Sequence, residues 1–136
     1  MKKILCLATV AALLFTACKK DKEQTTQERL QGSWKIESSI LKVVVAGTPN
    51  TSTYAGQPTD YVDFRTDGKV YTSVNGSLDT ANYTVSANQV TTTDTYPGAT
   101  PQVYNLTTLT EVVAQLYNRS SPSTTDYTEI TLNLKR

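Results

Sequence analysis

The fold is decided by residues 61–76, which read YVDFRTDGKVYTSVNG. Apolar and polar residues alternate on both sides of the turn at residues 66–68, so that Val62 and Phe64 share one face of a strand. The second run ends on Asn75-Gly76, a pair that typically forms the two-residue turn of a hairpin. This stretch therefore predicts antiparallel strands joined by tight turns.

The same alternation continues from Trp34 to the end of the sequence. In the first expected strand, residues 32–45, Trp34 and Ile36 face inward. Further along, the apolar residues Leu41 and Val43 lie at odd-numbered positions instead of even-numbered ones, which predicts a bulge near residues 39–41. Further strands are expected at about 61–65, 69–74, 80–85, 89–94, 101–106, 111–117 and 126–135, with turns around 87–88, 97–98 and 118–123. We expect an all-β domain of eight antiparallel strands over residues 30–136, in up-and-down order, whose first and last strands pair.

Residues 46–59 do not fit this strand pattern. They are rich in Gly, Pro, Thr and Ser, and we expect a long loop that is the most mobile part of the domain. Loops of this length are usually either functional or disordered. If this loop acts as a lid, Tyr54 near its middle is the candidate lid contact.

Residues 1–17 have the order of an export signal. Two lysines follow Met1, an apolar run covers residues 4–15, and Thr16-Ala17 precedes Cys18. A membrane-spanning helix needs about 20 apolar residues, so this run predicts a cleaved signal peptide. The alternative is an ordinary secreted protein cut near Ala17.

The residues before Cys18, Phe15-Thr16-Ala17, resemble the bacterial lipobox, which implies a lipid on the Cys18 thiol and a membrane partner. The chain has 2 Cys and the other, Cys6, lies in the signal, so no disulfide is expected. Residues 18–29 are charged and predict a flexible tether, with a capping box between Thr25 and Glu28. Charged residues behind the cysteine resemble lipoprotein export signals of Bacteroidota, which implies the cell envelope, at the outer membrane, on its periplasmic or surface face.

The composition of residues 30–136 narrows the function classes. Seven Lys and Arg stand against nine Asp and Glu, a balance that excludes a nucleic-acid partner. The chain has no His and this domain no Cys, so the usual general bases, nucleophiles and metal ligands are missing. We expect no enzyme, catalytic residue, cofactor or metal site, and we expect a monomer.

Short motifs spread over residues 30–136 resemble the lipocalin-like lipoproteins of Bacteroidota. They are Leu30-Gln31-Gly32-Ser33-Trp34, which is similar to the Gly-x-Trp motif that opens lipocalins, and the stretches at residues 61–70, 83–88, 104–110 and 132–136. The resemblance implies a lipocalin-like barrel whose first long loop folds over its mouth. It also implies that an arginine lies across the tryptophan of the first motif.

The alternation of inward-facing residues in the first and last strands predicts the same contact independently of the resemblance. Trp34 faces inward from the first strand, and the inward alternation of the last strand reaches Arg136. Since these strands should lie antiparallel and adjacent, we expect the guanidinium of Arg136 to stack on the Trp34 indole and close the barrel.

The barrel interior is the candidate binding site. An eight-stranded barrel is either filled by its own side chains or holds one small ligand. The inward residues include four with polar groups, and these are the candidate ligand contacts: Thr72, Thr92, Tyr83 and Tyr104. The alternative is that both tyrosines pack as ordinary core.

Two functions remain open for such a domain. The first is a lipoprotein that binds a small lipophilic or amphipathic ligand. The second is a structural or interaction module with a filled barrel that serves an envelope protein complex. Separately, Asp79-Thr80-Ala81 resembles the O-glycosylation site of Bacteroidota, which implies Thr80 as an acceptor; the alternative is ordinary turn chemistry.

The lipobox generates the first testable prediction. Cys18→Ser should leave an uncleaved or mislocalised precursor that incorporates no labelled palmitate, because the acyl chains need the thiol. Metabolic labelling and membrane fractionation measure this. A mutant that still reaches the membrane in a mature, lipidated form would show that the lipobox interpretation is wrong.

Overall fold

The computed structural model describes residues 23–136, so the predicted signal peptide and Cys18 lie outside the described residues. The described chain holds one short helix followed by strands, with no helix in it long and apolar enough to cross a membrane. The elements are α1 (Thr26–Leu30), β1 (Gly32–Val45), β2 (Thr48–Ala55), β3 (Tyr61–Phe64), β4 (Lys69–Val74), β5 (Ser77–Ser86), β6 (Gln89–Asp94), β7 (Gln102–Leu109), β8 (Val113–Ser120) and β9 (Tyr127–Lys135).

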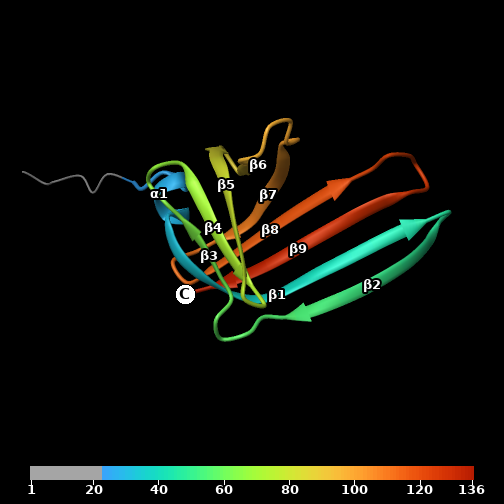
Figure 1. Cartoon of the computed structure of the whole chain (residues 1–136), viewed down its shortest axis with the longest axis horizontal. Helices are drawn as coiled ribbons and strands as arrows, with labels where there is room; N and C mark the ends of the chain where they lie inside the picture. The colour runs from blue at the N-terminus through green and yellow to red at the C-terminus, as the bar shows by residue number, and fades with distance from the viewer. Residues whose placement is uncertain (1–22) are drawn as a thin grey trace, which may run out of the picture.

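Eight of these strands form a closed antiparallel barrel. The hydrogen-bonded order runs β1-β3-β4-β5-β6-β7-β8-β9, and β9 pairs with β1 to close the ring. The predicted eight-stranded up-and-down barrel, with its first and last strands paired, is therefore confirmed. β2 is an additional strand that lies outside the ring, on the edge of β1 (Figure 1).

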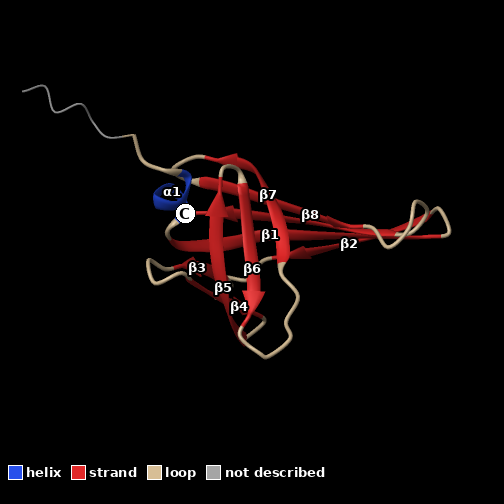
Figure 2. Ribbon diagram, turned by 90° about the horizontal axis from the view of Figure 1, so that it is seen from above, coloured by secondary structure: helices blue, strands red, loops and turns tan. Residues whose placement is uncertain are grey.

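β1 takes part in the barrel with one half and in a projecting sheet with the other. Residues 32–35 pair with β3, whereas residues 38–45 pair with β2 on that same side. Its opposite edge pairs with β9 along residues 35–44. The far ends of β1, β8 and β9 thus join β2 in a four-stranded sheet, called the arm here, which extends from the barrel with no other element on either face (Figure 2).

The predicted long loop at residues 46–59 is wrong, because most of it is β2. All eight residues from Thr48 to Ala55 pair with β1, and Ala46 and Gly47 make the turn with φ values of 48° and 76°. Thr is favoured in strands, which offsets the loop-like composition. Pro49 is tolerated because β2 is an edge strand that needs no hydrogen bonds on its free side.

The bulge of β1 lies earlier than predicted. The register with β9 shifts between Ile36 and Ser38, which leaves Glu37 as the extra residue. Gly56 fits against this point: a Cβ there would lie 1.8 Å from the Ile36 carbonyl oxygen, so only glycine allows β2 to leave β1 here. Likewise, residues 118–120 belong to β8 and not to the predicted turn, since they pair with β9.

The core fills the closed end of the barrel, where α1 lies. Trp34 is fully buried, and its indole N–H donates to the Leu30 carbonyl over 2.7 Å. The Arg136 guanidinium lies 3.9 Å from the indole centroid and also donates to the Arg29 carbonyl over 3.3 Å, so the predicted contact is confirmed. The predicted capping box at Thr25 is likewise present.

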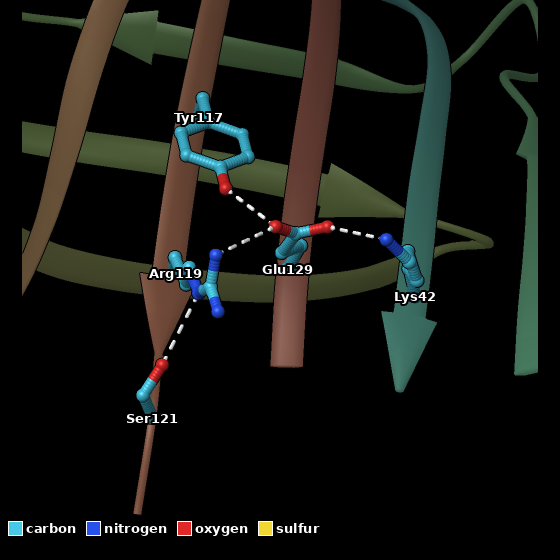
Figure 3. A network of polar contacts seen from close by, with 5 residues as sticks. All are labelled: Lys42, Tyr117, Arg119, Ser121 and Glu129. Atoms are coloured by element: carbon cyan, nitrogen blue, oxygen red, sulfur yellow. Dashed lines mark hydrogen bonds and ion pairs between the residues drawn. The ribbon is translucent and has the colours of Figure 1, made fainter. Parts of the chain in front are cut away.

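Polar contacts stabilise the arm, whose two faces lack any covering layer. On its outer face the Glu129 carboxylate lies 3.2 Å from the Lys42 ammonium and 3.6 Å from the Arg119 guanidinium, and it accepts from the Tyr117 hydroxyl (Figure 3). Hydrogen bonding to Tyr117 and then to Lys42 lowers the pKa of Glu129. At the tip, the Ala46 N–H donates to the Asp126 carboxylate over 2.7 Å. Each hairpin of the arm is therefore bound to the other.

The closed end generates a prediction about stability. Arg136→Ala should lower the free energy of unfolding by about 1 to 2 kcal/mol, because it removes a cation–π contact and leaves helix carbonyls without this donor. Urea unfolding followed by the fluorescence of the single Trp measures the change.

Lys135→Ala is the matched control, because its ion pair with Glu37 is exposed on both sides and should contribute less than about 1 kcal/mol. Equal effects of the two substitutions would contradict a special role for the stacked guanidinium.

Candidate functional site: the barrel cavity

The open half of the barrel contains a cavity of about 250 Å³. Its wall is mostly apolar at depth and more polar towards the mouth. The lining residues come from β1 and β3 to β9, namely Ser39, Val62, Phe64, Val70, Thr72, Asp79, Thr80, Ala81, Val90, Thr92, Asp94, Tyr104, Leu116, Ile130 and Leu132. The closed end below is filled by the core around Trp34.

A second cavity of about 410 Å³ lies at the mouth, between the barrel and the arm. Its lining includes Leu41 of β1 and Tyr54 of β2. Both cavities are lined by four of the same residues, Ser39, Val62, Thr72 and Leu132, so they lie next to each other. Ligand pockets typically start at about 300 Å³, a size that the mouth cavity exceeds and the barrel cavity approaches.

Most of the predicted contact residues do line this space. Thr92 and Tyr104 lie in the barrel cavity, Thr72 lies in both parts, and Tyr54 lies at the mouth. Burial, and after it the charge of Asp94, raises the pKa of Tyr104, so its hydroxyl stays protonated and able to donate. Tyr54 reaches the mouth from a paired strand and not from the flexible loop that was expected.

Tyr83 is the exception, since it lines neither part of the described cavity. Its hydroxyl donates to the Arg65 carbonyl over 2.8 Å, and its ring meets Phe64 edge-on with centroids 5.1 Å apart. Tyr83 therefore packs as core at the closed end, as the alternative interpretation held. Thr80 lies within β5, half-buried, opposite Tyr71.

Sequence reasoning missed two acidic residues of the wall, Asp79 and Asp94. Both follow the alternation that identifies their neighbours, since Asp79 precedes inward Ala81 by two residues and Asp94 follows inward Thr92 by two. The expected strand at 80–85 began one residue too late to include Asp79. Extending the alternation of inward-facing residues to the ends of these two strands would have identified both aspartates.

Asp60 is a third missed residue and the only buried carboxylate of the described chain. It is 1% exposed and accepts hydrogen bonds from the Tyr54 hydroxyl, from the Gln57 N–H over 2.8 Å and from the Asn75 N–H over 3.0 Å. These bonds, the first from Tyr54, lower the pKa of Asp60. Asp60 thus links the end of β2 to the β4–β5 turn beside the mouth cavity.

The fold and the cavity define the class: a small closed antiparallel barrel with an open, largely apolar interior. Among residues 23–136 no group of three or more acidic, His or Cys side chains is placed to hold a metal. No family model matches the chain, and neither a curated protein nor a solved structure matches it.

The Asp60 contacts generate a prediction on pH dependence. Asp60→Asn should lower the urea midpoint at neutral pH, because an amide accepts these three bonds less strongly than a carboxylate. The folded pKa is lowered below the usual 3.8, so this stabilisation is present above pH 3.8 and is lost as the pH falls through the folded pKa. The two proteins should therefore converge in acid.

Urea titrations between pH 7 and pH 2 measure this convergence. Asp63→Asn is the control, because Asp63 pairs only with exposed Arg65 on the outside of the barrel. A gap between wild type and Asp60→Asn that stays constant to the lowest pH would contradict the assignment.

Proposed function

We propose that this protein is a membrane-anchored lipoprotein whose barrel binds a small lipophilic or amphipathic ligand. The observation that supports the proposal is a pair of adjoining cavities, one at the mouth and one lined by the apolar side chains of the barrel interior. A barrel filled by its own side chains would have no such space.

The wall has the composition that an amphipathic ligand needs. Val62, Phe64 and Val90 at depth are buried and apolar, and contact with them gives about 25 cal/mol per Å² of apolar surface removed from water. Thr72 and Thr92 add hydroxyls on the same inner faces. Such a site holds an apolar body by burial and orients it by a few polar contacts.

The anchor part of the proposal comes from the residues around Cys18, which lie outside the described chain. The described chain enters the barrel at α1, beside the closed end (Figure 1). A lipid on Cys18 would therefore join the barrel from the end opposite to the arm. This arrangement suits a protein of the outer membrane of the cell envelope whose mouth stays accessible.

The alternative is an interaction module for an envelope protein partner, and the arm favours it. β2 leaves one edge without a partner strand, and none of its eight residues is charged. Exposed edges usually carry charges that prevent pairing with another chain, so an uncharged edge suits the addition of a strand from a partner.

Ligand binding generates the next prediction. Thr92→Phe places a ring in the barrel cavity and should weaken binding of a neutral apolar fluorophore such as N-phenyl-1-naphthylamine at least tenfold. The unfolding temperature should change little, because the ring fills existing space. Fluorescence titration measures the binding.

Thr91→Phe is the matched control, since its side chain leaves the same strand on the outer face, opposite Thr84 and Val103. It should bind the fluorophore as the wild type does. If the wild type binds no apolar fluorophore, or if both variants lose binding equally, the cavity is not a binding site and the interaction module becomes the better proposal.

A further inference from the structure

The polar half of the cavity carries charge of one sign only. Asp94 stands directly opposite Ala81 in the β5–β6 ladder, and Asp79 lies two residues from Ala81 on the same face. Residues in this diagonal relation lie about 7 to 8 Å apart, so both carboxylates border one region of the wall. No described Lys or Arg lines either part of the cavity.

Neither carboxylate is neutralised within the described chain. Its four ion pairs involve Glu129, twice, and Asp63 and Glu37, all outside the cavity. The Asp79 carboxylate accepts one hydrogen bond, from the Thr80 N–H over 2.7 Å, and the half-buried side chain of Asp94 has no hydrogen bond or ion pair within the described chain. Both carboxylates border the cavity, with Asp94 half-buried and Asp79 exposed at its mouth.

The surroundings strengthen the charge of this pair. Apolar walls keep the effective dielectric constant of a cleft below that of water, so charges of one sign focus the potential there. An anionic group that enters the mouth would meet two like charges without a counter-ion. A cationic group would instead complete two ion pairs.

We propose that the cavity takes an amphipathic cation, an apolar body with an ammonium group that lies between Asp79 and Asp94. This inference rests on the proposed function, because it names the ligand class of the same cavity. The apolar body contacts Val90 and Leu116 at depth, while the hydroxyls of Thr92 and Tyr104 lie along the wall beside the charged end.

Three probes with the same ten-carbon chain test the charge preference: decylamine, decanol and decanoate. Calorimetric titration uses residues 23–136, which contain every element of the barrel together with its own buried core, at neutral pH and low salt. We expect decylamine to bind about tenfold more tightly than decanol and decanoate more weakly than either. The difference should shrink as salt is added, since the pairs are partly exposed.

The double variant Asp79→Asn and Asp94→Asn should bind the amine and the alcohol with equal affinity. Glu111→Gln, an exposed acid in the β7–β8 turn, removes a negative charge from outside the cavity and should keep the preference. Unfolding temperatures of both variants establish that each is folded.

The outcomes separate the two proposals. If the three probes bind with equal affinity, or decanoate binds best, the cation inference is overturned while ligand binding stands. If the preference for the amine survives in the double variant, the two aspartates are not its source and the inference is likewise overturned. If none of the probes binds, the proposed function fails and the inference fails with it.

Discussion

The pairing of β1 with β9 is the constraint on which the rest of the structure depends. Along residues 35–44 of β1 it closes the barrel, and its outer part continues as the centre of the arm. A closed ring leaves no free edge in the barrel itself, which is how small all-β domains avoid pairing with other chains. The closure also brings Arg136 onto Trp34, because the end of β9 lies beside the start of β1.

The bulge at Glu37 divides β1 into its two roles. Before it, Trp34 and Ile36 face the core, and after it Ser39 and Leu41 face the cavity. The extra residue changes the direction of the strand, which leaves the β3 edge and becomes available to β2. Because Gly56 has no side chain, β2 can end against the Ile36 backbone and the chain can turn to β3.

The cavity is a consequence of small side chains at the open end. At the closed end the inward positions carry large side chains such as Trp34 and Tyr83, and the interior is packed. Towards the mouth they carry Ser39, Thr72 and Ala81, which leave space that the opposite wall does not fill. The packed core and the cavity therefore lie at opposite ends of one barrel, and the arm borders the mouth.

The alternation of residues and the turn pairs were visible in the sequence, so the barrel, the inward parity of the core and the contact of Arg136 with Trp34 could be predicted. These features depend on local geometry, since a strand places every second side chain on one face. Residues 46–59 were misread because composition alone does not distinguish a Thr-rich loop from a Thr-rich edge strand.

The sequence by itself thus determined the eight strands of the barrel, their order and which of their side chains face inward. Only the tertiary structure decided where β1 bends, that β2 pairs with it, and that Asp60 accepts hydrogen bonds from Tyr54 and Asn75 beside the mouth. The physical reason is that a bulge, an edge pairing and the space inside a barrel depend on residues far apart in the chain. Their positions relative to one another follow from closure of the ring, which no local pattern encodes.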